Sequence, residues 1–110
     1  MKTDLTDKVV LITGASGGIG SAIARKFADE GARLVLHYLS GKSRAEELRR
    51  ELSGVEVLPV RADLTKESDV LRLVSTALKE FGRVDTLIAN AGSWETRDVP
   101  LHQTPRRSMR

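Results

Sequence analysis

The sequence predicts an α/β fold: a Rossmann-like, doubly wound parallel sheet, truncated to the order βαβαβαβ. Short apolar runs typical of buried strands alternate with segments of helical periodicity, and a glycine lies near the end of each expected helix. Right-handed crossovers and a glycine-rich turn after the first strand favour the strand order 3-2-1-4. Pro59 agrees with this order, because proline lacks an amide donor and the third strand is then an edge strand.

The elements follow one another without a repeat or a low-complexity insert. The expected strands are residues 8–13, 32–39, 55–60 and 84–90, and the expected helices are residues 18–30, 43–52 and 66–81. Apolar residues that share one face of a helix should pack on the sheet. They are Ile19, Ala22, Ile23 and Phe27 in the first helix, and Val70, Val74, Ala77, Leu78 and Phe81 in the third. Thr65 is expected to cap the third helix at its N-terminus, and Gly82 at its C-terminus.

The turn between the first strand and the first helix has the composition of a phosphate site. Gly14 permits a sharp exit from the strand, and Gly18 removes a side chain where a pyrophosphate would approach the backbone. Gly20 lets the helix lie close to the sheet. Free amides and the positive end of the helix dipole would face the ligand. Taken alone, the same glycines also fit a tight turn that binds nothing.

Two further motifs stand in register with this turn. Asp63-Leu64 follows the third expected strand, and Asn90-Ala91-Gly92 follows the fourth. With Thr13 and the glycine spacing they resemble the signature of the short-chain dehydrogenase/reductase family, a group of NAD(P)-dependent oxidoreductases, over residues 8–92. The resemblance implies a nicotinamide dinucleotide cofactor. The implied binding residues in these motifs are Gly14, Ser16, Gly18, Ile19, Gly20, Asp63, Leu64, Asn90, Ala91 and Gly92.

The resemblance also assigns roles to the later motifs. It implies that Asp63 hydrogen-bonds the adenine ring; the alternative is a carboxylate that serves only a turn or a helix cap. It implies that Asn90, Ala91 and Gly92 steady the central sheet and line the ribose–nicotinamide side of the cofactor.

The end of the second strand bears on the choice between NADP and NAD. NAD enzymes generally place an acid there for the ribose 2′-hydroxyl, and residues 36–44 contain none. Ser40, Lys42, Ser43 and Arg44 are suited to a 2′-phosphate, so NADP is the expected cofactor and NAD the second choice. The alternative is a solvated helix N-terminus with basic residues. Some NADP-preferring members of the family carry a basic residue at the position of Gly17, so the glycine found there does not add to the case for NADP.

No catalytic residue is assigned within the chain. The resemblance implies that the chemistry uses a Tyr-x-x-x-Lys pair on a later helix, together with a serine and an asparagine, and in the family all of these normally lie well beyond residue 110. Tyr38 and Lys42 have the Tyr-x-x-x-Lys spacing, but they lie at the adenosine end of the expected site, and Gly41 interrupts any helix between them. We therefore reject them as an active site.

Residues 1–92 are expected to form a partial NAD(P)-binding domain, and residues 93–110 a loop or disordered tail. The implied function is the NADP(H)-binding part of a short-chain oxidoreductase that transfers hydride between cofactor and a carbonyl or alcohol. The alternatives are a non-catalytic nucleotide-binding or interaction module and a nonfunctional fragment. The parent enzyme is expected to be a homo-oligomer, and the chain alone to self-associate through an uncovered fourth strand.

Composition narrows the classes of protein to which the chain can belong. The 110 residues carry a net charge of +3, and Arg106, Arg107 and Arg110 account for all of it, so no basic face for nucleic acid is expected. The chain has no cysteine and only two separated histidines, which gives no metal-ligand cluster. No run is long enough to span a membrane and the N-terminus lacks a signal core, so a cytoplasmic location is expected.

Overall fold

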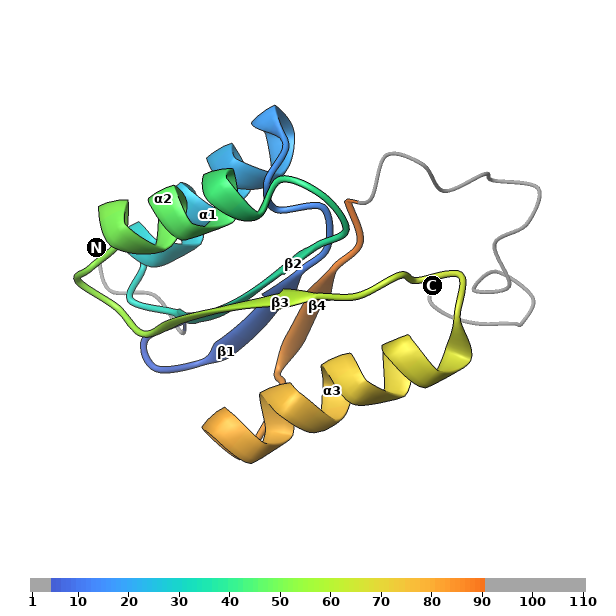
Figure 1. Ribbon diagram of the computed structural model, residues 1–110. Coiled ribbons are helices and arrows are strands. Elements are labelled where there is room, and N and C mark those ends of the chain that lie inside the picture. The colour runs from blue at the N-terminus through green and yellow to red at the C-terminus, as the bar shows by residue number, and fades with distance from the viewer. Residues whose placement is uncertain (1–4, 91–110) are drawn as a thin grey trace.

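The computed structural model describes residues 5–90, which form one parallel sheet with helices on both faces (Figure 1). The strands are β1 (Val9–Ile12), β2 (Arg33–Tyr38), β3 (Val57–Arg61) and β4 (Thr86–Ile88). The helices are α1 (Gly18–Asp29), α2 (Lys42–Glu51) and α3 (Glu67–Phe81). All seven expected elements are present. The expected tail at 93–110 lies outside the described residues.

The sheet has the order β3-β2-β1-β4 with every pair parallel, which confirms the predicted fold class and strand order. β3 is an edge strand, and Pro59 in it lies opposite Leu36 of β2. Because all strands run the same way, their carboxyl ends gather at one edge of the sheet. The turns into α1, α2 and α3 all begin at that edge, as does the segment after β4.

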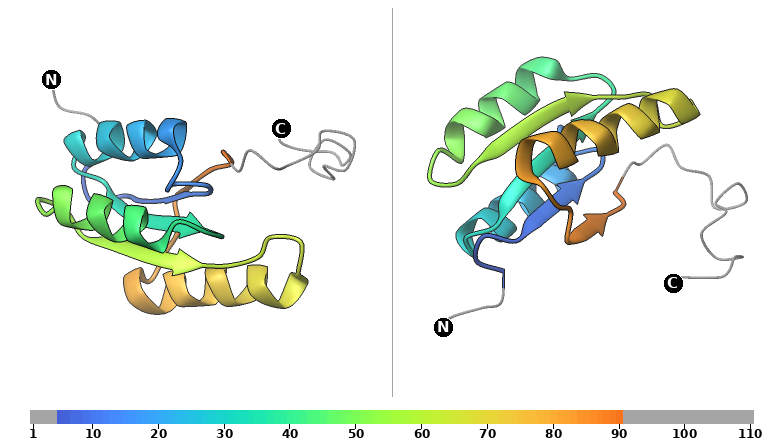
Figure 2. Two further views of the ribbon diagram at one scale, coloured as in Figure 1. Left: turned by 45° about the horizontal axis from the view of Figure 1, so that its top comes forward. Right: turned by 90° about the horizontal axis from the view of Figure 1, so that it is seen from below.

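Two apolar cores hold the layers together. Helices α1 and α2 cover one face of the sheet and α3 covers the other, as the views in Figure 2 show. The core on the α1 and α2 side includes Val10, Ile12, Ala24, Leu34, Leu36 and Leu48. The core on the α3 side includes Val9, Leu11, Val35, Val60, Leu73 and Ala77. Strand β1 is buried along its whole length, as its unbroken apolar sequence requires.

Helix α1 packs through a face shifted from the predicted one. Ile23 and Phe27 pack against the core as expected, but Ile19 is 70% exposed and Ala22 is exposed, so the prediction was wrong for these two. The buried positions of the helix are Gly20 and Ala24. The small residues therefore face the sheet, because the helix backbone approaches it closely at Gly20.

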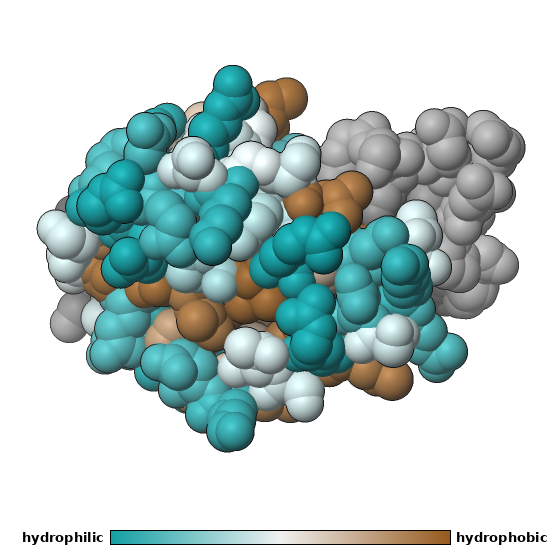
Figure 3. Space-filling model, viewed as in Figure 1, coloured by the Kyte–Doolittle hydropathy of each residue, from teal (hydrophilic) through white to brown (hydrophobic). Residues whose placement is uncertain are grey.

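Helix α3 shows a similar difference. Its buried residues are Leu73, which the prediction omitted, and Ala77, whereas Val74 is 40% and Leu78 46% exposed. The residue that caps α3 is Lys66, without a side-chain bond, so the expected capping role of Thr65 was also wrong. Figure 3 shows polar residues over the outer surface of the helices and an apolar band between the layers.

Candidate functional site

The turn from β1 into α1 presents backbone amides at the carboxyl edge of the sheet. Gly14 has φ +66°, a conformation that favours glycine, and its carbonyl accepts the amide of Gly17 at 3.2 Å. The first helical bond of α1 runs from the amide of Ser21 to the carbonyl of Gly17 at 2.9 Å. The amides of the three residues before Ser21 therefore precede the helical ladder, at the positive end of the helix dipole. Such a helix terminus suits a phosphate.

Gly18 and Gly20 differ in what surrounds them. A Cβ built on Gly18 would meet no atom within 4 Å, so the surface above it is open. A Cβ on Gly20 would collide with the carbonyl oxygen of Gly14 and lie 2.8 Å from the Cα of Ala15. Gly20 thus serves helix packing, while Gly18 leaves space for a group outside the protein. The close approach at Gly20 agrees with its expected role in helix packing, whereas the expected role of Gly18 stays a prediction.

The ring of His37 in β2 forms a hydrogen bond with the glycine turn. Its ring is 3% exposed, and the amide of Gly14 donates to its Nδ1 at 3.1 Å. Its Nε2 lies 2.8 Å from the carbonyl oxygen of Ala62, just beyond β3. Burial lowers the pKa of the imidazole, and the bond to Ala62 opposes that shift only in part. The sequence prediction did not include His37; an isolated histidine in an apolar strand was the available signal.

The turn from β2 into α2 lies against the glycine turn. The hydroxyl of Ser16 donates to the carbonyl of Ser40 at 3.0 Å. Gly41 has φ +86°, and a Cβ there would lie 3.0 Å from the Ser16 Oγ. The first helical bond of α2 runs from the amide of Ala45 to the carbonyl of Gly41, so the amides of Lys42 and Ser43 precede that ladder. Two helix N-termini therefore lie near each other at this edge.

The side chains on this second turn are free to face solvent. Ser40, Lys42 and Ser43 are all exposed. Among residues 5–90, no salt bridge engages the Lys42 ammonium. Since residues 36–44 contain no acid, the local charge favours an anion.

Asp63 begins the turn from β3 into α3. Its Oδ1 accepts the hydroxyl of Thr65 at 2.6 Å and the amide of Thr65 at 3.0 Å. These bonds hold the pKa of the Asp63 carboxyl below its usual value, the hydroxyl contributing most. Its own amide donates to Oδ2 of Asp69 at 2.8 Å. Asp63 therefore has the turn role that was the alternative reading, and this role occupies only one of its two carboxylate oxygens.

Asn90 follows β4 and lies next to the glycine turn. The backbone amide of Asn90 donates to the Thr13 hydroxyl at 2.7 Å, and the backbone amide of Thr13 donates to the carbonyl of Ile88 at 3.0 Å. A Cβ on Gly20 would lie 2.9 Å from the Asn90 Nδ2, so the side chain reaches the base of α1. Thr13, 4% exposed, thus joins β1 to the end of β4. Ala91 and Gly92, the other members of this motif, lie outside the described residues.

The remaining expected residues take different positions. Ile19 projects from the first turn of α1 with most of its surface exposed, beside the open space at Gly18. Leu64 is half-buried and packs against the α3-side core. Tyr38 is 7% exposed within β2, whereas Lys42 lies beyond it at the start of α2. Tyr38 and Lys42 thus belong to different elements at the β2 end of the site.

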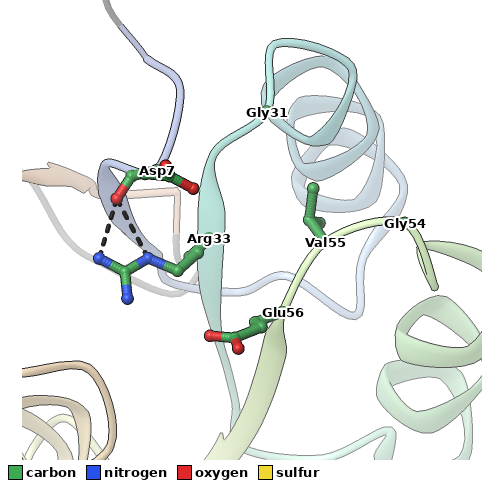
Figure 4. A pocket seen from close by; sticks show the side chains of 6 residues that line it. All are labelled: Asp7, Gly31, Arg33, Gly54, Val55 and Glu56. Carbon is green, nitrogen blue, oxygen red and sulfur yellow. Dashed lines mark hydrogen bonds between the residues drawn. The ribbon is translucent and has the colours of Figure 1, made fainter.

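A hollow also occurs at the opposite edge of the sheet (Figure 4). It is lined by residues at or just before the starts of the strands, among them Asp7, Arg33 and Glu56. The guanidinium of Arg33 donates to the backbone carbonyl of Asp7 at 2.9 and 3.1 Å. Since ligands of open α/β sheets bind at the carboxyl ends of the strands, this hollow is not the expected site.

The strand order and the helices on both faces define a doubly wound α/β protein with a glycine turn after its first strand. The model of the short chain dehydrogenase family matches residues 8–110. The chain belongs to this family of oxidoreductases. The hydroxynaphthalene reductase-like protein Arp2 of Metarhizium brunneum is 42% identical to it over 91 residues, which cover 81% of this chain and 34% of the relative. The chain therefore spans about a third of the length of such relatives.

Solved structures agree with the fold. The 3-ketoacyl-(acyl-carrier-protein) reductase from Brucella melitensis, complexed with NADH, matches with a TM-score of 0.70 at 42% identity. That match covers 76% of this chain and 34% of the other. The NADPH-dependent 3-quinuclidinone reductase from Rhodotorula rubra matches with a TM-score of 0.68 at 34% identity, over 76% of this chain and 32% of the other.

Two kinds of feature are absent from the described part of the chain. None of the helices within residues 5–90 is long and apolar enough to cross a membrane. In the same range, no three His, Asp or Glu side chains are grouped so that they could hold a metal ion.

Proposed function

We propose that this chain is the cofactor-binding part of a short-chain oxidoreductase and binds NADP(H) at the carboxyl edge of its sheet. The nicotinamide, when bound, would supply or accept a hydride in exchange with a carbonyl or alcohol substrate. The proposed domain spans residues 1–92. Its proposed binding residues are Gly14, Ser16, Gly18, Ile19, Gly20, Ser40, Lys42, Ser43, Asp63, Leu64, Asn90, Ala91 and Gly92.

The observation that carries the proposal is the open surface at Gly18. A Cβ would meet nothing within 4 Å there, and the amides of Gly18, Ile19 and Gly20 precede the first helical bond of α1, so they are available as donors. An internal packing role would leave contacts around that position, as it does at Gly20. A pyrophosphate fits both the missing side chain and the donor set.

The preference for NADP rests on the turn between β2 and α2. The exposed Lys42 ammonium, the hydroxyls of Ser40 and Ser43, and the N-terminus of α2 would surround a 2′-phosphate. An acid for a free 2′-hydroxyl is missing from residues 36–44. The similar structures include one complexed with NADH and one described as NADPH-dependent, so the residues of this turn decide the proposal.

The carboxyl ends of β3 and β4 complete the proposed site. The second carboxylate oxygen of Asp63 would accept the adenine amino group, while Thr65 fixes the carboxylate through Oδ1. Asn90, held by Thr13 at the base of α1, would line the ribose–nicotinamide side.

We also propose that the 110-residue chain does not turn over substrate by itself. General acid–base groups contribute about 10² to 10⁴-fold only when they are positioned at the reacting atoms. Tyr38 and Lys42, the candidates by spacing, lie at the end of β2 and the start of α2, on the side assigned to adenosine.

Isothermal titration with NADPH and NADH tests the binding proposal. We expect wild type to bind NADPH more tightly, and Gly18→Val to weaken binding by about tenfold or more because the side chain occupies the pyrophosphate position. Gly54→Val is the matched control, since a Cβ there also meets nothing within 4 Å and the residue lies at the opposite edge of the sheet. Equal affinities for wild type and Gly18→Val, or no binding by wild type, would contradict the proposal.

A further inference from the structure

The ring of His37 links the loop after β1 to the loop after β3, and these two strands are not neighbours in the sheet. Nδ1 accepts the amide of Gly14, after β1, and Nε2 faces the carbonyl of Ala62, after β3. A nitrogen that faces an N–H must accept, and one that faces a C=O must donate. The partners therefore fix the neutral tautomer with the proton on Nε2.

The first contact determines which amides the glycine turn presents. The amide of Gly14 points at the His37 ring, and the amide of Ala15 donates to the His37 carbonyl at 2.9 Å. One residue of β2 thus holds two successive amides inward. The amides that follow, in the first turn of α1, are the ones left for a ligand.

The second contact fixes the position of Asp63. The amide of Ala62 donates to the carbonyl of Tyr38 at 3.0 Å, and the carbonyl of Ala62 accepts from the His37 ring. Ala62 is therefore held on both sides, and Asp63 follows it directly. A rotation of that peptide would redirect the Asp63 side chain.

We propose that His37 is a positioning residue for the cofactor: it couples the phosphate-binding turn to the loop of Asp63 through its two ring nitrogens. This inference rests on the proposed function. His37 is 3% exposed, so its ring would not contact the cofactor and would act through Gly14 and Ala62. An apolar residue of similar size would fill the same space but would leave both backbone groups without their partner.

Three substitutions separate the two contacts. Asparagine places an acceptor oxygen where Nδ1 stands, so His37→Asn keeps a partner for Gly14. Glutamine places an amide donor at the distance of Nε2, so His37→Gln keeps a partner for Ala62 alone. His37→Leu keeps neither. Val35→Ala, a buried change on the same strand and the same face, controls for general loss of stability.

The test is NADPH affinity by isothermal titration, together with hydrogen exchange at the Gly14 amide and thermal unfolding of each variant. Loss of one buried hydrogen-bond partner corresponds to about a tenfold loss of affinity if its effect is confined to the site. We expect His37→Asn and His37→Gln each to lose about tenfold in affinity and His37→Leu to lose at least as much, whereas the Gly14 amide should become exposed to exchange in His37→Gln and His37→Leu only. Val35→Ala should lower the melting temperature while keeping affinity.

The possible failures are distinguishable. If wild type binds no NADPH, the proposed function fails. If wild type binds and either His37→Asn or His37→Gln binds equally well, the inference that His37 couples the two loops is overturned and the proposed function stands. If Val35→Ala loses affinity as much as His37→Gln at equal melting temperature, the effect is one of stability and the inference is also overturned. His37→Leu is not needed for these decisions, so its failure to fold would leave the test intact.

Discussion

Replacement of Gly20 by alanine is expected to lower stability by an amount that the structure allows us to derive. The added Cβ would collide with the carbonyl oxygen of Gly14 and lie 2.8 Å from the Cα of Ala15. Both are backbone atoms, so no change of rotamer relieves the contact. Overpacking of this kind costs about 1–3 kcal/mol, and the upper end applies here.

Alanine also favours a helix over glycine by up to about 1 kcal/mol, which offsets part of that cost. A net loss of about 2 kcal/mol corresponds to a melting temperature lower by about 10 °C in a domain of this size. Gly18→Ala is the matched control, because the Cβ there meets nothing within 4 Å and the melting temperature should stay equal or rise. Thermal unfolding followed by circular dichroism measures both. A Gly20→Ala variant that melts at or above wild type would refute the reasoning.

Three further outcomes are expected. The Asp85 carboxylate binds the Arg83 side chain and the Val9 amide, which hold its pKa below the ordinary value of 3.8. It therefore adds stability that is present above that value and lost as pH falls through the lower folded value. The urea midpoint of wild type should exceed that of Asp85→Asn at about pH 6, and this difference should be smaller at about pH 3; an equal difference at both pH values would contradict the reasoning. Leu87 in β4, at the sheet edge of the described residues, is 53% exposed, so light scattering should show self-association that Leu87→Lys reduces; a monodisperse wild-type monomer would contradict it. A carbonyl panel should show no NADPH oxidation by the 110-residue chain, and turnover lost on Tyr38→Phe would show that Tyr38 was wrongly dismissed.

The order of the elements could be predicted because it depends on local patterns. Apolar runs, glycine positions and right-handed crossovers give the strand order, and Pro59 marks the β3 edge. The helix faces were harder to predict. In α3 apolar residues extend around more than one side, so periodicity selected Val74 and Leu78 although Leu73 is the buried one. Which side faces the sheet depends on the strand beneath, which periodicity does not include.

The candidate site likewise has one part that the sequence predicts and one part that it does not. The glycine turn has a sequence signature because it requires a particular backbone conformation at Gly14 and an absent side chain at Gly18. The contacts of His37 have no such signature. Its partners Gly14 and Ala62 are 23 and 25 residues away, and they offer backbone groups that any residue carries. Only the register between β1, β2 and β3 brings them together.

Nuclear magnetic resonance titration of the labelled chain with NADPH tests the central claim most directly, because it reports which edge of the sheet binds. The account predicts that the largest amide shifts occur at the carboxyl edge, at Gly18, Ile19, Lys42 and Asp63, with none at Gly54 beside the opposite hollow. Shifts centred on that hollow, or no shifts with NADPH in excess, would contradict the claim that this chain binds the cofactor through its glycine turn.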